Sequence, residues 1–282
     1  MKAIIILLLL IFTCSTVFAQ EKDLNKIADS IYNEGMRLYM SEWASWNGTD
    51  VFREKCTSMQ SLSTGYLSYD NGNGLINIFF SEGTDPKVLS TISFGYDLEA
   101  KNYKLDTISR SFNAIERNLY TIRQTALKEM DKDTFFRHYD NTSLNLIPII
   151  NNNIKKVYIL TGTSVNGVVI FGNDYLINFD KDNNIINKKR LHKNLIPVYT
   201  DKDTTGTISF HTHLAETGDF MTSTDVCTLL LYEKFTKWSQ HYVGSPDYFS
   251  IWDCKTDKLV IITMAAMKRI QESQKKEPPK KN

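Results

Sequence analysis

The chain has 282 residues, of which 42% are hydrophobic, so it can bury a substantial core and is not intrinsically disordered. Its 33 lysines and arginines nearly balance its 32 aspartates and glutamates, and the formal net charge is +1. No strong positive field attracts nucleic acid or an acidic membrane, so the composition excludes these as principal partners.

The first twenty residues have the pattern of a signal peptide. Lys2 supplies the positive start, residues 3–12 form an apolar run, and residues 17–19 form a small-residue cleavage site. The run is too short for a transmembrane anchor. We therefore expect an exported protein, either periplasmic, secreted or on the outer surface. Lipid attachment at Cys14 is the second alternative, because its preceding residues fit a lipobox poorly.

Three cysteines remain after the predicted cleavage, namely Cys56, Cys227 and Cys254. In an exported protein this number favours one disulfide and one free thiol. The sequence does not choose the pair, although a bond between Cys227 and Cys254 would join a helix to a hairpin. Metal binding by cysteine is disfavoured, since no two of the three are close in sequence.

Residues 21–140 are predicted to form a helix and an antiparallel sheet. Apolar residues recur at helical spacing over residues 23–44, and the helix is expected to end near the turn Asn47-Gly48. A turn at residues 71–74 joins two strand-like segments, which indicates a hairpin. Residues 113–132 predict a second helix with one apolar stripe.

The rest of the chain predicts a second region of mixed strands and helix. Residues 141–153 lose periodicity and are rich in asparagine, so we expect a linker or long loop there. Strand patterns and one helix, over residues 225–238, fill residues 154–268. The Lys- and Pro-rich residues 269–282 predict a disordered tail. The expected fold class is therefore α+β.

One stretch carries the candidate chemistry. His211 and His213 are two apart on a predicted strand, so their side chains point to the same face, and Asp225 lies at the start of the next helix. Two imidazoles and one carboxylate suit zinc in an open site, where a fourth position is left for water. The sequence therefore predicts a zinc site at these three residues.

The order strand, His-x-His, loop, Thr-x-x-Asp, helix and two strands resembles the JAMM motif of the JAB1/MPN metalloprotease superfamily. The resemblance covers residues 155–265 and implies an α/β domain with a mixed sheet and zinc at His211, His213 and Asp225. Thr222 stands where the family has a serine that polarises the substrate carbonyl, and Ser223 is the neighbouring alternative. The implied activity is hydrolysis of a peptide or isopeptide-like amide in a peptide or protein substrate.

The chain departs from the family in two ways. Leu214 replaces the proline that follows the second histidine, and no glutamate occurs between Met130 and Ala215 to serve as the general base. Hydrolysis needs a group that takes the proton and passes it to the leaving amine. Four carboxylates could replace the missing base: Asp174, Asp180, Glu116 and Glu42.

The same residues also have a purely structural interpretation. Thr222 to Asp225 is typical of a helix start, where a hydroxyl caps the free amides and an acidic residue suits the helix dipole. Two functions therefore stay open. One is an exported zinc-dependent hydrolase, and the other is a non-catalytic exported binding or envelope-associated protein on a degenerate JAMM-like scaffold. The missing base favours the second, and the intact ligand trio favours the first.

The other histidines and the aromatic residues have separate expectations. His138 and His192 lie beside basic or loop residues and are predicted to be solvated. His241 follows a predicted helix, whose dipole would favour its protonated form. A cluster near the first helix could bind sugar or peptide or could pack a domain interface; its members are Tyr39, Trp43 and Trp46.

Overall fold

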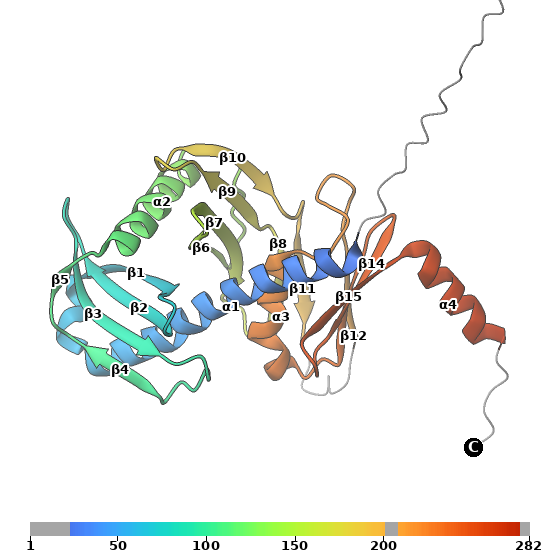
Figure 1. Cartoon of the computed structure of the whole chain (residues 1–282), viewed down its shortest axis with the longest axis horizontal. Coiled ribbons are helices and arrows are strands. Elements are labelled where there is room, and N and C mark those ends of the chain that lie inside the picture. The colour runs from blue at the N-terminus through green and yellow to red at the C-terminus, as the bar shows by residue number, and fades with distance from the viewer. Residues whose placement is uncertain (1–22, 201–207, 277–282) are drawn as a thin grey trace, which may run out of the picture.

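A computed structural model describes residues 23–200 and 208–276 of the chain (Figure 1). The predicted signal peptide and residues 277–282 lie outside this described part. The fold class is α+β, as expected, with antiparallel sheets and one mixed sheet in the C-terminal region. A long first helix, α1 (Leu24–Lys55), runs along the molecule from the N-terminal sheet to the C-terminal one (Figure 1).

The N-terminal sheet is antiparallel, with strand order β1-β2-β3-β4 and β5 paired to β3. The helix α2 follows it and begins with the capping box of Asn113 and Glu116. The elements here are a 3-10 helix (Thr57–Leu62), β1 (Ser63–Asp70), β2 (Leu75–Ser81), β3 (Lys87–Phe94), β4 (Tyr103–Asp106), β5 (Arg110–Ser111) and α2 (Ala114–Met130).

The first helix is longer than predicted, and the expected turn at Asn47-Gly48 is wrong. Both residues lie inside α1, where the helix packs on the sheet. A Cβ atom at Gly48 would lie 2.2 Å from Oδ1 of Asn77 on β2, so glycine is what lets the helix approach the sheet. Packing against the sheet therefore outweighs the local turn preference of this dipeptide.

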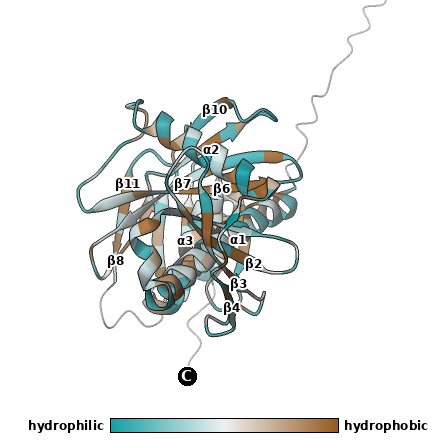
Figure 2. Ribbon diagram, turned by 90° about the vertical axis from the view of Figure 1, so that its left-hand side faces the viewer, coloured by the Kyte–Doolittle hydropathy of each residue, from teal (hydrophilic) through white to brown (hydrophobic). Residues whose placement is uncertain are grey.

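The central sheet has the order β10-β9-β7-β6. Its strands are β6 (Thr142–Asn151), β7 (Ile154–Thr163), β9 (Tyr175–Phe179) and β10 (Ile185–Arg190), the last of which is largely hydrophilic (Figure 2). The expected linker at residues 141–153 is wrong, because β6 occupies most of it and pairs with β7 along its whole length. Asn152 and Asn153 form the turn after β6, and Asn145 lines a cavity. Leu146 and Ile147 are buried.

The C-terminal region contains a two-stranded sheet, β8 with β11, and the mixed sheet β12-β13-β14-β15. The strands β12 and β13 are parallel, and α3 connects them; the other pairs are antiparallel. The elements are β8 (Val168–Gly172), β11 (Leu195–Tyr199), β12 (Ile208–Thr212), α3 (Ser223–Thr236), β13 (Gln240–Gly244), β14 (Tyr248–Asp253), β15 (Lys258–Thr263) and α4 (Met264–Lys276).

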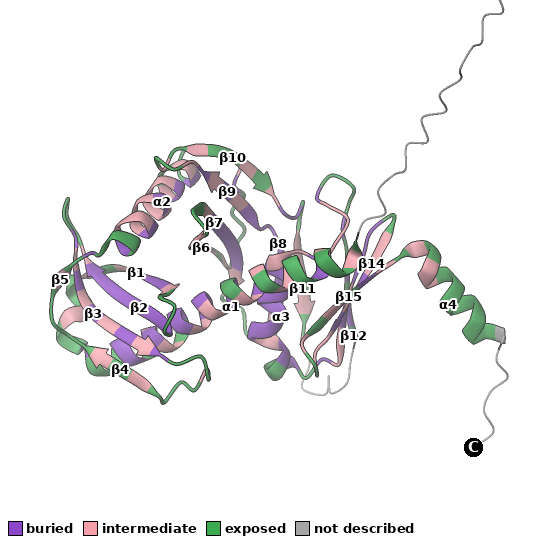
Figure 3. Ribbon diagram, viewed as in Figure 1, coloured by how far each residue is buried: buried purple, intermediate pink, exposed green. Residues whose placement is uncertain are grey.

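The two regions share one core through the contact of α1 with α3. Nearly all of α3 is buried, as the purple ribbon in Figure 3 shows, and Leu38 packs in the same cluster as Val226. At the crossing, a Cβ atom on Gly35 would lie 2.6 Å from Cβ of Val226. Gly35, which weakens an isolated helix, thus lets α1 and α3 approach closely.

Two further expectations are wrong. Cys56, Cys227 and Cys254 are all free thiols, so the described chain has no disulfide, and the first two are buried in the core. The predicted disordered tail begins too early, because α4 continues to Lys276 as an exposed helix (Figure 3). Within the described residues, none of the helices has the length and apolar character needed to span a bilayer.

Candidate metal centre

The strand β12 and the helix α3 place the three predicted ligands together. His211 lies on β12 opposite Val243 of β13, and the amide of His213 donates to the carbonyl oxygen of Gly244 at 2.8 Å. Pairing with β13 therefore fixes both histidines. Asp225 is the third residue of α3, in the first turn of the helix.

Asp225 is held by the helix cap. Its amide donates to Oγ1 of Thr222 at 3.1 Å, and its Oδ2 accepts from the Thr222 amide at 2.7 Å and from Oγ1 of Thr222 at 2.8 Å. The structural interpretation of Thr222 is thus confirmed. The cap engages Oδ2, whereas Oδ1 has no hydrogen bond of good geometry within the described part of the chain. The free oxygen is available to a cation.

His192 joins the three predicted residues and completes a group of four. Its Nε2 atom lies 3.0 Å from Nε2 of His213 and 3.1 Å from Oδ1 of Asp225. Nε2 of His211 lies 3.1 Å from Nε2 of His213 and 3.5 Å from Oδ1 of Asp225. One ligand atom from each of the four residues lies within 4.8 Å of all the others.

A tight backbone contact holds His192 in this position. The segment after β10 runs beside the end of β8, where Gly172 has a φ of +83°. A Cβ atom at Gly172 would lie 2.3 Å from the carbonyl oxygen of Asn194 and 3.3 Å from Cβ of His192. Only glycine combines this φ with this approach.

The ligand rings are held by a second set of contacts. Nδ1 of His211 lies 2.9 Å from Nε2 of His241, whose Nδ1 lies 2.7 Å from Oγ of Ser209. Phe171 stacks on His241, with ring centroids 4.5 Å apart. With Nε2 of His211 on a metal, Nδ1 carries the proton and donates to His241, the arrangement that orients histidine ligands in metal sites.

His192 has a carboxylate behind it. Its Nδ1 lies 3.5 Å from Oδ2 of Asp174, and Oδ1 of Asp174 accepts from the amide of Thr161 at 3.0 Å. All of these side chains are buried. His192, His211, His213 and Asp225 are each at most 4% exposed.

The electrostatics of the group favour a cation. Burial raises the pKa of Asp225, but the nearby imidazoles, His192 first, outweigh burial and hold that pKa well below its usual range. Burial disfavours the charged form of His192, yet the carboxylates of Asp225 and Asp174 raise its pKa to about 10. Burial holds the pKa of His211 well below its ordinary value. The ionised carboxylate of Asp225 and the neutral imidazole of His211 are thus the favoured forms, as metal ligation requires, whereas His192 must release its proton to a cation that it binds.

The four residues fit a tetrahedral zinc ion. Zinc bound at 2.0–2.2 Å by nitrogen and oxygen separates its ligand atoms by roughly 3.3 Å. Four spacings among Nε2 of the three histidines and Oδ1 of Asp225 are 3.0–3.5 Å and bracket this value. Three imidazoles and a carboxylate form a donor set that suits zinc and other late first-row metals. The free Oδ1 of Asp225 faces the same point, so His192, His211, His213 and Asp225 would together hold the ion.

The remaining predicted residues lie elsewhere or have structural partners. Ser223 lines a separate surface cavity with Glu34. Among the candidate bases, Asp180 accepts from the amides of its own turn, and Glu116 pairs with Arg110 at 2.7 Å. Glu42 lines a cavity, and only Asp174 contacts the cluster.

His192 was expected to be solvated and is buried, so that expectation is wrong, whereas His138 is exposed as predicted. The expected protonated form of His241 is also wrong, because burial lowers its pKa to about 4. His192 follows a strand with a hydrophilic face, and its loop position gives no periodic signal. One signal was present, because the range of chain that lacks glutamate contains two further histidines, His138 and His192. Either histidine is a possible fourth ligand by sequence, and the one that joins the cluster is His192.

No protein-family model matches the chain, and no curated protein is significantly similar to it in sequence.

Proposed function

We propose that this is an exported zinc-binding protein whose four-residue centre is structural and whose role is non-catalytic binding. The observation that carries the proposal is the position of His192, whose Nε2 atom lies at ligand spacing from both His213 and Asp225. A fourth protein ligand fills the position that a zinc hydrolase keeps open for water. Export rests on the N-terminal sequence pattern.

Burial supports the same function. The four ligand side chains are almost inaccessible, which suits an ion that stabilises a fold and leaves little access for an extended amide substrate. The centre joins β12, α3 and the segment after β10, which are three separate parts of the chain. A bound ion would link these three segments.

A zinc hydrolase acting on a peptide or isopeptide-like amide is the second candidate. The contact of His192 with Asp174 favours it, because Asp174 could stabilise a protonated His192 and this pair could replace the missing glutamate as the base. Zinc, when bound by His211, His213 and Asp225, supplies a Lewis acid for the carbonyl. In this function His192 is not a ligand.

Metal analysis of the purified mature protein tests both functions. We expect one zinc per chain, lost in the His211→Ala/His213→Ala variant and reduced in His192→Ala, while His138→Ala keeps full occupancy. X-ray absorption of the zinc should show four protein ligands. Full zinc in His192→Ala, with three protein ligands and loss of amide hydrolysis, would establish the hydrolase instead. A metal-free wild type refutes both functions.

A further inference from the structure

A cavity of about 460 Å³ lies between the N-terminal and C-terminal regions. Five parts of the chain line it: α1 contributes Glu42 and Trp46, β1 contributes Tyr66, the β6–β7 hairpin contributes Asn145, β8 contributes Ile170, and α3 contributes Thr228 and Tyr232. Its volume is in the range of small-molecule sites, which often form where different parts of a chain meet.

Aromatic rings form one wall of the cavity. Trp46 is 40% exposed, and its ring meets Tyr232 edge to face with centroids 5.6 Å apart. Of the aromatic cluster singled out in the sequence, Tyr39 is buried and Trp43 packs against Phe94, so only Trp46 is presented to a ligand. An exposed indole with a fixed neighbour offers a flat apolar face and a polar edge.

Hydrogen-bonding groups also line the cavity, and several have no protein partner in the described chain. Oε2 of Glu42 accepts from Nδ2 of Asn145 at 2.6 Å, but Oε1 has no partner among the described residues, although Glu42 is only 6% exposed. The hydroxyls of Thr228 and Tyr232 and the indole N–H of Trp46 likewise have no hydrogen-bond partner in the described chain. These atoms are accessible from the cavity, so they can bond a ligand that supplies both donors and acceptors.

The charge of the cavity selects a neutral ligand. No lysine, arginine or histidine is among the lining residues in the described chain, and the charge of Arg123 acts on Glu42 and Tyr66 from outside the lining, so an anionic ligand would contact no cationic side chain. Burial raises the pKa of Glu42 to about 7, which also weakens the case for a cation. A ligand with many uncharged hydroxyls and one flat apolar face fits this lining of aromatic rings and hydrogen-bonding groups.

We infer that this cavity binds a pyranose ring of a neutral glycan, with the ring stacked on Trp46 and its hydroxyls bonded to Glu42, Asn145 and Thr228. This inference deepens the proposed binding function and rests on it. The occupant would lie close to the metal centre, because Thr228 follows Asp225 by one turn of α3, and Thr161, which also lines the cavity, donates to Asp174.

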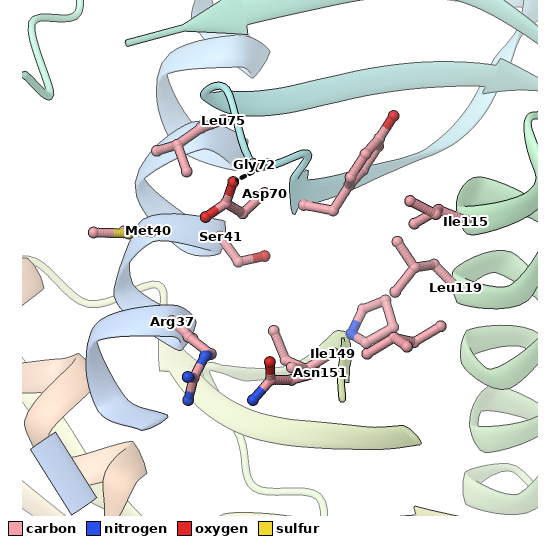
Figure 4. A pocket seen from close by; sticks show the side chains of 13 residues that line it. Arg37, Met40, Ser41, Asp70, Gly72, Leu75, Ile115, Leu119, Ile149 and Asn151 are labelled. Carbon is pink, nitrogen blue, oxygen red and sulfur yellow. Dashed lines mark hydrogen bonds between the residues drawn. The ribbon is translucent and has the colours of Figure 1, made fainter. Parts of the chain in front are cut away.

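Another cavity, of about 350 Å³, has a different character (Figure 4). Aliphatic side chains, including Leu75, Ile115 and Leu119, make up much of its lining (Figure 4). Its one basic side chain in the described chain, Arg37, pairs with Glu34 at 3.2 Å. Its lining is therefore more aliphatic than that of the cavity beside Trp46.

Isothermal titration of the metal-loaded protein with cellobiose, maltose and N,N′-diacetylchitobiose tests the inference. We expect saturable one-to-one binding of at least one of these neutral disaccharides. Trp46→Ala should weaken that binding at least tenfold, and Thr228→Val at least threefold. Tyr96→Ala, which removes a similarly exposed ring on the N-terminal sheet, should leave it unchanged. Thr228→Val removes only a hydroxyl, so the test stands even when the Trp46 variant misfolds.

Three results would overturn the inference. The first is that none of the three sugars binds saturably, and the second is that wild type and a folded Trp46→Ala protein bind the sugar with equal affinity. The third is that tetra-alanine binds saturably and the sugars do not. Zinc content is measured on the same samples. Zinc without sugar binding refutes only this inference, and sugar binding by a zinc-free protein refutes only the proposed metal centre.

Discussion

Nε2 of His192 lies 3.0 Å from Nε2 of His213, although the two residues come from different segments and neither is on the surface. Two imidazole nitrogens at this distance share at most one proton, and Nε2 of His211 faces the same His213 atom. A single cation can satisfy all three nitrogens and the free oxygen of Asp225.

Removal of the metal should lower stability. A chelator such as 1,10-phenanthroline is expected to lower the melting temperature, and added zinc should restore it, because a ligand that binds only the folded state stabilises it. At a free zinc concentration of about 1,000 times Kd the effect is about 4 kcal/mol. Calorimetry with and without chelator measures it, and identical melting curves would argue against a structural ion.

Gly172→Ala should weaken metal binding from outside the ligand set. The new Cβ would collide with the Asn194 carbonyl and displace the segment that carries His192. We expect a loss of about 1–3 kcal/mol of stability and a lower zinc affinity, measured by competition with a chromogenic chelator. Gly83→Ala is the matched control, because Gly83 also has a positive φ but a Cβ added there would have nothing within 4 Å. Equal zinc affinity in the two variants would contradict this role of Gly172.

His241→Ala should reduce zinc affinity about 10–100-fold without removing a ligand. The substitution frees Nδ1 of His211 from its partner and leaves that ring less well oriented. Zinc competition measures the change, with His138→Ala as the control because His138 is exposed. Wild-type affinity in a folded His241→Ala protein would show that the contact does not orient His211.

Gly35→Ala should destabilise the protein even though alanine favours helix. The added methyl would overlap Val226 at the α1–α3 crossing, and overpacking of this kind costs about 1–3 kcal/mol. Ser30→Ala, on an exposed position of the same helix, should change stability by less than about 0.5 kcal/mol. Urea unfolding measures both, and a more stable Gly35→Ala protein would show that the helices separate easily.

Glu42 should make stability depend on pH. Burial raises its pKa to about 7 from an ordinary 4.5, so the folded state binds the proton more tightly than the unfolded state. Its contribution is therefore fully present below pH 4.5 and is lost as the pH rises to about 7, with a magnitude of about 3 kcal/mol. The difference in unfolding free energy between wild type and Glu42→Gln should show this slope. A difference that is constant between about pH 4.5 and 7 would contradict it.

The sequence predicted the parts of the site that follow from local periodicity. Strand alternation placed His211 and His213 on one face, and the cap pattern placed Asp225 in the first turn of a helix. His192 was missed because its position depends on the approach of two segments at Gly172, which no local pattern encodes. The sequence therefore predicted three ligands and an open position, and not the four protein ligands that His192 would complete.

The same distinction explains the errors in the fold. Asn47-Gly48 favours a turn in isolation, but packing of α1 on the sheet extends the helix through it. Residues 141–153 lack alternation because β6 is covered on several sides, by α1, α2 and β7. The long helix α2 was predicted nearly to its ends, since its apolar stripe and capping box are both local.

The contact of Gly35 with Val226 also bears on when the protein can fold. The two residues are separated by about 190 positions, so α1 emerges early in synthesis but gains its main helical partner only after most of the chain has followed. Contacts of such long range slow folding, because chain entropy is lost before they form. The C-terminal part of α1 can pack on β1, β2 and β3 early, but the part around Leu38 stays uncovered until α3 has been made.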